Sequence, residues 1–324
     1  MRNGIHMRNG IHSFPAMGTT ANIQLVGRNV RPIALAAQEK LGVLEQHWSR
    51  FIPTSDVARI NQAAGRPVAV HPTTVTLLET AIAAWKGTGG LFSPFLCGVM
   101  AAIGYGHSRS FPPVLVPHAR TAHVQAGSQI GSDCPLVVDA KNCTAMVRPG
   151  TGIDLGGIAK GFSVDLVAAE CEDSGAVAGL VDAGGDMAFF VADSGPQVPW
   201  QISIDDPFSV EIDNPFSIGT LDRMSAFRGG VATSSTLRRR WRNSNGEVVH
   251  HLVDPRTGSS SASDVAAVTV FADSCANAEV LTKQFLLLGT AGALARAEAL
   301  GVDALLVGSD RSVHRAGYWK GLVA

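Results

Sequence analysis

The chain has 324 residues, which is enough for about two average domains or one large one, and enough to bury a core without disulfides or a metal. Charged residues make up only 16% of the chain, which favours a compact, well-buried enzyme over a disordered protein. The 26 basic and 27 acidic residues give a net charge of −1, which excludes a general positive field for nucleic acid or an anionic membrane.

The N-terminus repeats the hexapeptide Met-Arg-Asn-Gly-Ile-His over residues 1–6 and 7–12. Residues 1–12 are therefore expected to be disordered, and the folded domain is expected to span residues 13–324 as two closely packed α/β lobes. No apolar run follows the first arginine and none is long enough to span a membrane, so neither a signal peptide nor a transmembrane segment is expected. With five cysteines and no Cys-x-x-Cys motif, these features favour a cytoplasmic location.

Apolar periodicity predicts the elements of the first half of the chain. They are a strand over 16–26, helices over 31–48 and 73–86, and a hairpin over 135–147. Ser55 is expected to cap a short helix through Asn61, because a serine oxygen can accept a free N–H group at a helix start. Residues 104–131 are rich in Gly, Pro, Ser and His, and are expected to form a long surface loop.

The second half of the chain also mixes helices and strands. Helices are expected over 162–173, 276–288 and 291–300, and strands over 179–191, 200–205, 229–234, 250–253, 265–271 and 304–307. Gly184 and Gly185 interrupt the first of these strands, which predicts a bulge or kink there. Because no regular βαβ period runs through the chain, we expect an α+β fold with mixed or antiparallel sheets packed by helices.

The densest chemical signal is the glycine-rich segment 153–161, which carries Asp154 near its start and Lys160 near its end. Free N–H groups at a helix start attract phosphate, and a lysine adds a point charge. The segment matches neither a Walker P-loop nor the Gly-x-Gly-x-x-Gly motif. From these residues alone, a phosphate-binding loop and a plain tight turn into a helix are equally open.

Polar side chains also cluster at the predicted turn 254–258, where His251 and Asp254 could face a cleft at a strand end. A metal site built on His250 and His251 is disfavoured, because adjacent residues of a strand point to opposite faces. The hydroxyl cluster 233–235 lacks the Gly-x-Ser-x-Gly motif, which argues against a serine hydrolase.

Taken in order, six segments resemble the successive motifs of the ApbE-type FAD:protein FMN transferases. They are Met17–Thr20, Ser49–Phe51 with Ser55 and Asn61, Asp154–Gly161, Asp182–Asp186, Ala232–Ser234 and His251–Gly258. The resemblance implies an α+β flavin-transferase fold that holds FAD in a cleft. It also implies a reaction that moves FMN from FAD to a threonine hydroxyl of a partner protein and releases AMP. Some members of the family instead hydrolyse FAD to FMN and AMP.

The resemblance implies roles for single residues as well. Contacts to FAD are implied for Met17, Phe51, Leu91, Phe92, Ser93, Asp154, Lys160, Thr233 and His251. Catalytic roles are implied for Lys160, His251 and Asp254, and Mg²⁺ ligation for the carbonyl of Gly157 and for Glu279 and Thr282. A metal, a lysine and helix N–H groups would together neutralise the anionic diphosphate of FAD.

Two positions depart from the family pattern. Ser93 stands where the family usually has aspartate, so a hydrogen-bonding group is kept and a charge is lost. Lys283 stands at a usual metal-ligand position, and an ammonium group cannot bind Mg²⁺. Glu279 and Lys283 lie four residues apart on a predicted helix, which indicates a structural ion pair as one interpretation. The other interpretation is that the Lys283 ammonium takes the place of the metal beside the diphosphate.

The expected function is FMN transfer from FAD to an acceptor protein with a flavinylation-motif threonine, supported by Mg²⁺ or by Lys283 in its place. One alternative is an FAD pyrophosphatase, in which water replaces the threonine hydroxyl. Another is a non-catalytic FAD-binding protein on the same fold. The presence of Lys160, His251 and Asp254 favours an enzyme.

Overall fold

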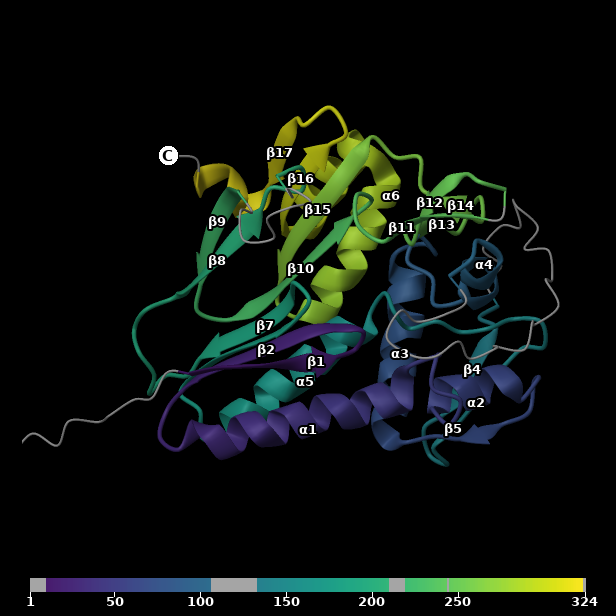
Figure 1. Ribbon diagram of the computed structural model, residues 1–324, viewed down its shortest axis with the longest axis horizontal. Helices are drawn as coiled ribbons and strands as arrows, with labels where there is room; N and C mark the ends of the chain where they lie inside the picture. The colour runs from purple at the N-terminus through teal and green to yellow at the C-terminus, as the bar shows by residue number, and fades with distance from the viewer. Residues whose placement is uncertain (1–9, 106–132, 210–218, 244, 323–324) are drawn as a thin grey trace, which may run out of the picture.

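The structure is a computed structural model that describes residues 10–105, 133–209, 219–243 and 245–322. Its largest sheet is antiparallel throughout, with eight strands in the order β1-β2-β6-β7-β10-β15-β16-β17 (Figure 1). The strands are β1 (Gly10–Ala16), β2 (Thr19–Val26), β6 (Ala178–Ala183), β7 (Asp186–Val191), β10 (Gly229–Ser235), β15 (Val265–Ala272), β16 (Asp303–Gly308) and β17 (Val313–Ala316). The predicted α+β class with antiparallel sheets is confirmed.

Both faces of this sheet are covered. The covering elements are α1 (Val30–Trp48), α5 (Ala159–Asp173), α6 (Cys275–Leu300), β8 (Trp200–Asp205), β9 (Thr220–Ala226) and the 3-10 helix η1 (Gly317–Leu322). The three α-helices pack on one face and enclose the main core, and the β8–β9 ribbon and η1 lie on the other (Figure 1). Successive side chains of β10 point to opposite faces of the sheet, since Val231 faces the ribbon and Ala232 faces the helices. Because both of its faces are buried, β15 is apolar along nearly its whole length.

A second group of elements lies beside the sheet, on the right in Figure 1. It comprises α2 (Asp56–Gln62), α3 (Pro72–Gly87), α4 (Cys97–Ala102), the three-stranded sheet of β3 (Val68–Ala69), β5 (Thr144–Val147) and β4 (Leu136–Asp139), and the ribbons β11 (Arg240–Arg242) with β12 (Val248–His250) and β13 (Val253–Asp254) with β14 (Ser259–Ser260). Segments distant in the chain meet here, since the Trp241 indole N–H donates to the Ile103 carbonyl at 2.7 Å. Within the part of the chain that the structure describes, no helix has the length and apolar character needed to cross a membrane.

Local interactions explain why several predicted elements are confirmed. The helices expected over 31–48 and 73–86 are α1 and α3, and the hairpin expected over 135–147 is β4–β5. Ser55 caps α2, because its Oγ accepts the N–H group of Ala58 at 3.0 Å. In each case short-range periodicity and capping chemistry were sufficient to locate the element.

The N-terminal prediction differs from the structure. Strand β1 begins at Gly10 and pairs with β2, so the last residues of the duplicated segment 1–12 belong to the sheet instead of being disordered. Their pairing partner, β2, is a strand with a buried face, and it supplies the order that their own sequence does not predict. The surface loop expected over 104–131 lies outside the described residues beyond Tyr105.

Two strand predictions are wrong in their connections. A hairpin, β6–β7, replaces the single kinked strand expected over 179–191, because Gly184 and Gly185 form its two-residue turn. The strand expected over 250–253 is divided, with β12 ending at His250 and β13 beginning at Val253. In both cases a short turn within an apolar run was mistaken for an irregularity or a continuation of the strand.

Candidate active site

A cavity of about 690 Å³ lies where the large sheet meets the second group of elements. This volume is within the range of about 300–1,000 Å³ that is typical of small-molecule sites. Most of the predicted site residues line it: Met17, Phe51, Leu91, Phe92, Ser93, Asp154, Gly157, Lys160, Thr233, His251, Glu279 and Lys283. The structure therefore brings segments from the whole length of the chain to one site.

Two neighbouring hairpin turns contribute to the lining of the cavity. Met17 and Gly18 connect β1 to β2, and Gly184 and Gly185 connect β6 to β7; all four have positive φ, from 53° to 95°. A two-residue turn between antiparallel strands favours positive φ at both positions. The turns approach closely, because a Cβ on Gly184 would lie 2.4 Å from Oγ1 of Thr19. They hold Met17 at the cavity, where the prediction places an FAD contact.

The glycine-rich segment reaches the cavity in a well-defined conformation. The Asn61 amide clamps it, since Nδ2 donates to the Ile153 carbonyl at 2.9 Å and Oδ1 accepts the Ile153 N–H at 2.7 Å. One carboxylate oxygen of Asp154 accepts the N–H of Gly156 at 2.9 Å, and the other lies 2.8 Å from Nε of Arg50. The segment leads directly into α5, so loop and helix start lie together as a phosphate-binding loop requires.

Aromatic side chains form another part of the lining. The Tyr105 and Trp241 rings stack with centroids 5.1 Å apart, and the Phe51 ring meets Tyr105 edge-on at 6.3 Å. The Arg50 guanidinium lies 4.2 Å from the Phe51 ring centroid and donates to the Tyr105 carbonyl at 2.6 Å. Such flat surfaces suit contact with a planar ring system. Sequence reasoning missed Tyr105 and Trp241, because they are far apart in the chain and only the fold brings them together.

The remaining predicted FAD contacts come from the segment after α3 and from β10. Phe92 is buried beside Gly157, and Ser93 accepts the N–H of Phe95 through its Oγ at 3.2 Å. Thr233 is exposed on β10 and its Oγ1 lies 2.9 Å from Oγ1 of Thr269. These hydroxyl groups give the cavity polar contacts that carry no charge.

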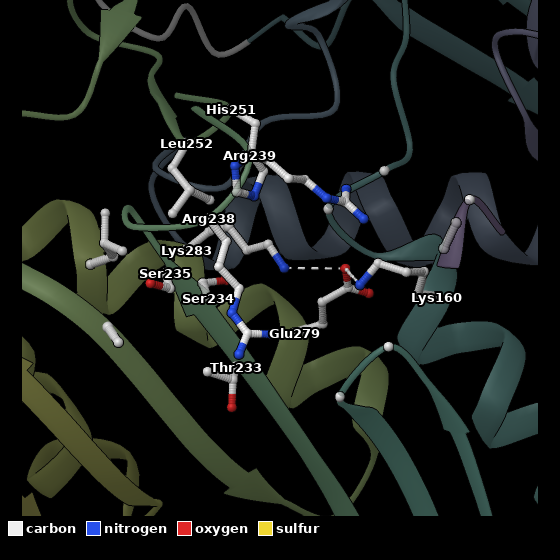
Figure 2. A pocket seen from close by; sticks show the side chains of 18 of the residues that line it. Lys160, Thr233, Ser234, Ser235, Arg238, Arg239, His251, Leu252, Glu279 and Lys283 are labelled. Carbon is white, nitrogen blue, oxygen red and sulfur yellow. Dashed lines mark hydrogen bonds and ion pairs between the residues drawn. The ribbon is translucent and has the colours of Figure 1, made fainter. Parts of the chain in front are cut away.

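A charge cluster lies where α5 meets α6 (Figure 2). Glu279 is fully buried, and its Oε1 lies 3.2 Å from Nζ of Lys283 and 3.4 Å from Nζ of Lys160. Its Oε2 accepts the N–H of Gly161 at 2.8 Å, and Lys160 also pairs with the buried Asp186. Burial alone would raise the pKa of Glu279, but the two ammonium groups and the Gly161 N–H outweigh it and hold that pKa below its ordinary value.

Close packing of α5 on α6 positions this cluster. A Cβ on Gly161 would lie 2.6 Å from the Cys275 carbonyl oxygen, so a glycine is needed at this approach. Asp165 on α5 accepts the N–H groups of Cys275 and Ala276, both at 2.8 Å, and thereby caps the start of α6. Burial raises the pKa of Asp165 to about 6, although both N–H groups act in the opposite direction.

The two adjacent histidines have different environments. His250 is buried, with Nε2 3.1 Å from the Ser261 carbonyl and Nδ1 accepting a backbone N–H at 3.3 Å, so it holds the ribbons together. His251 lines the cavity, on the same side as Lys283 in Figure 2. Its Nδ1 is buried and finds no hydrogen-bond partner among the described residues. Burial, and then the charges of Arg239 and Lys283, lower the pKa of His251 to about 3, so its imidazole is neutral.

Two predicted site residues do not line the cavity. The Asp254 carboxylate is bound by the Arg256 guanidinium at 2.7 to 3.2 Å and accepts the Arg256 N–H at 2.8 Å, which closes the predicted turn. Thr282 is fully buried, where its Oγ1 donates to the Glu279 carbonyl at 2.7 Å and lies 2.8 Å from Oγ of Ser234. Both side chains thus make structural contacts, and the catalytic role of Asp254 and the metal-binding role of Thr282 stay predictions.

The predicted Mg²⁺ ligands do not fit a divalent metal. The Glu279 carboxylate already contacts two ammonium groups, and the Thr282 hydroxyl is used within the core. Across the described ranges, no group of three or more His, Cys, Asp or Glu side chains could hold a metal ion. Mg²⁺ prefers near-octahedral oxygen ligation, for which the carbonyl of Gly157 alone is insufficient.

Two further cavity residues, Arg238 and Arg239, were missed because the sequence shows them only as part of an arginine run after β10. In Figure 2, Arg238 extends toward Thr233, and Arg239 extends toward the side of the cavity where Lys160 lies. Guanidinium groups bind phosphate oxygens through paired N–H donors. The cavity thus has cations both on α5 and α6 and on the segment that follows β10.

Comparisons with known proteins agree on the family and the fold of this chain. The ApbE family profile matches residues 17–306. The chain is 28% identical over 325 aligned positions to the FAD:protein FMN transferase of Treponema pallidum (strain Nichols), covering 92% of this chain and 84% of that protein. It is 26% identical over 300 positions to the FAD:protein FMN transferase of Vibrio cholerae serotype O1, covering 91% of this chain and 86% of that protein.

The crystal structure of the ApbE protein from Thermotoga maritima superposes on this chain with a TM-score of 0.80 at 26% identity. The superposition covers 98% of this chain and 100% of that one, so the two share the complete fold. A profile match over residues 17–306, together with this shared fold, shows that the chain belongs to the ApbE family.

Proposed function

We propose that this protein is an FAD:protein FMN transferase, which moves FMN from FAD to a threonine hydroxyl of an acceptor protein and releases AMP. The observation that carries the proposal is a cavity that joins an aromatic lining, a glycine-rich loop and a cluster of cations around Glu279. FAD needs these three environments, because it consists of two planar ring systems joined by an anionic diphosphate. Relatives named for this activity align with most of the chain, which supports the proposal.

In the proposed reaction, the threonine oxygen forms a bond to the phosphorus on the FMN side of the diphosphate. The anhydride bond to AMP breaks, its electron pair leaves on the AMP phosphate oxygen, and the hydroxyl proton passes to His251. The threonine must lie in line with the leaving AMP, so positioning supplies much of the rate acceleration. Cations beside the diphosphate stabilise the charge that moves to the leaving oxygen.

Each cavity residue has a proposed role in this reaction. Lys160 neutralises the diphosphate from the start of α5. His251, whose Nδ1 has no partner among the described residues, accepts the hydroxyl proton, and the anionic diphosphate of bound FAD would raise the pKa of this imidazole from its low value in the empty cavity. Asp154 holds the glycine-rich loop against Arg50, so that the loop N–H groups can approach the phosphates. Contacts to the rings and ribose of FAD are proposed for Met17, Phe51, Leu91, Phe92, Ser93 and Thr233.

The proposal is tested by incubating the full-length protein with FAD and a folded acceptor domain that carries a flavinylation-motif threonine. We expect the intact mass of the acceptor to increase by one FMN less one water. An acceptor with alanine in place of that threonine is the matched control and gains no mass. Release of FMN and AMP without labelling would instead identify a pyrophosphatase, and FAD binding with neither product would identify a binding protein.

We also propose a cytoplasmic location. All five cysteines are free thiols, as expected in a reducing compartment. Burial raises the pKa of Cys97 to about 11 and that of Cys171 to about 12, so these two thiols are protonated and unreactive.

A further inference from the structure

We propose that Lys283 supplies, as a fixed side-chain cation, the charge that a divalent metal would otherwise bring to the FAD diphosphate, so that FMN transfer here does not require Mg²⁺. The inference rests on the proposed function, because it concerns how the same cavity binds and activates FAD. It chooses between the two interpretations of the Glu279–Lys283 pair. The pair is not only structural, because Lys283 lines the cavity.

The location of Lys283 is the first argument. A Cβ built on Gly157 would lie 3.7 Å from Cε of Lys283, so the end of the lysine side chain lies beside the glycine-rich loop. Its Nζ lies 3.2 Å from Oε1 of Glu279, and Figure 2 shows the side chain extending across the cavity to that carboxylate. The ammonium group therefore stands between the loop and Glu279, two of the places where metal ligands were predicted.

The occupancy of Glu279 is the second argument. Its two carboxylate oxygens already contact the ammonium groups of Lys283 and Lys160 and the N–H of Gly161. The two ammonium groups keep this fully buried carboxylate in its charged form, so its one negative charge is already offset by two positive charges. A third cation at this position would gain little attraction and would face the repulsion of both lysines.

The charge balance of the cluster is the third argument. Lys160, Lys283 and Arg239 act on one another electrostatically; the carboxylates of Glu279 and Asp186 pair with these lysines, and the carboxylate of Asp165 also acts on Glu279. Lys160 and Lys283 thus share the one carboxylate of Glu279, and Arg239 adds a further positive charge beside them, which suits an anionic diphosphate and opposes a divalent cation. Two ammonium groups together carry the same formal charge as one Mg²⁺, and a chelator cannot remove them.

The test compares transfer rates in excess EDTA and in millimolar Mg²⁺ for the full-length protein and three variants. For the unmodified protein we expect the same rate in both conditions. Lys283→Thr should be slower in EDTA by roughly 100-fold, the usual cost of removing one group that stabilises transition-state charge. Mg²⁺ should restore much of that loss, because the variant removes the nearer of the two ammonium groups from Oε1 of Glu279 and adds a hydroxyl ligand.

Two further variants make the comparison specific. Lys283→Met keeps the bulk of the side chain but supplies neither a cation nor an oxygen ligand, so it should be slow in both conditions. Lys141→Thr, at an exposed turn between β4 and β5, should behave as the unmodified protein. Both Lys283 variants keep the Lys160–Glu279 ion pair, so the buried carboxylate still has a partner.

A binding measurement gives a readout independent of activity. Titration with Mn²⁺ as the probe should detect no tight site in the unmodified protein and one site in Lys283→Thr. The inference is overturned if EDTA abolishes transfer by the unmodified protein and Mg²⁺ restores it, or if that protein binds Mn²⁺ as tightly as the variant. Absence of transfer under every condition would refute the proposed function instead, and the Mn²⁺ titration would still decide the role of Lys283.

Discussion

Glu279 is the residue on which the charge cluster depends. Its carboxylate pairs with Lys283 on the same helix, α6, and with Lys160 on α5, and it accepts the N–H of Gly161 near the start of α5. Breaking a buried ion pair by removing one partner leaves an uncompensated charge, which typically costs about 3–5 kcal/mol. We expect Glu279→Gln to lower the free energy of unfolding by this amount in urea titrations. Glu172→Gln, which breaks an exposed pair with Arg228, should cost less than about 1 kcal/mol. Equal losses for the two variants would contradict the importance assigned to Glu279.

His251 makes stability depend on pH at the residue scale. Its pKa is lowered to about 3 in the folded protein, whereas an unfolded histidine titrates near about 6.5. Below that unfolded value the unfolded chain binds a proton that the folded chain does not. The free energy of unfolding should therefore decrease as the pH is lowered from about 6.5 toward about 3, by up to about 1.4 kcal/mol per pH unit from this group. His251→Asn should lose less stability between about pH 7 and about pH 5, and parallel curves would refute this assignment.

Asp254 was predicted to be catalytic, and its position outside the cavity predicts a different phenotype. Its carboxylate accepts three side-chain contacts and one backbone N–H from Arg256. We expect Asp254→Ala to lower the free energy of unfolding by about 1–3 kcal/mol, the usual cost of lost charged hydrogen bonds. The transfer rate per folded molecule should change little, whereas His251→Asn should lower that rate with a smaller effect on stability. A stable Asp254→Ala protein without transfer activity would restore the catalytic interpretation.

At the scale of elements, the contact between α5 and α6 controls the geometry of the site. Because a Cβ on Gly161 would meet backbone atoms of Cys275 and Ala276 at 2.6 to 2.7 Å, Gly161→Ala must push the two helices apart. We expect a loss of about 1–3 kcal/mol in thermal or urea unfolding and a weaker affinity for FAD, since Lys160 and Glu279 would separate. The matched control is Gly42→Ala in α1, where a Cβ meets nothing within 4 Å and stability should rise by about 0.5–1 kcal/mol. An unchanged FAD affinity in Gly161→Ala would show that the helix contact does not position the site.

Whole elements were predictable where the signal is local. Helices α1 and α3 follow apolar periodicity, and Ser55 marks the start of α2 by its capping oxygen. The pairing of β1 with β2 was not predictable, because Gly10 and the residues after it obtain their order from a partner strand. The β6–β7 turn at Gly184 and Gly185 was likewise mistaken for a kink, since a local pattern does not show where a chain reverses direction.

At the scale of the whole molecule, the site was predictable only as far as its motifs are contiguous. Lys160 and Asp154 were found because they lie together in one glycine-rich segment. Trp241 was missed, and Asp186 was placed in a motif without a role, because their contacts, to Tyr105 and to Lys160, join segments that are distant in the sequence. Asp254 lies within the motif His251–Gly258, but its carboxylate lies outside the cavity lining and binds Arg256. Long-range packing therefore decides which motif residues act on a ligand.

The central claim is that this cavity transfers FMN with the cations of the protein itself. It is tested most directly by the intact mass of a threonine-bearing acceptor domain after incubation with FAD and the full-length protein in excess EDTA. The account predicts that the acceptor gains one FMN, less one water, on its threonine. An acceptor that remains unlabelled in EDTA would contradict the claim, whether or not Mg²⁺ then restores the transfer.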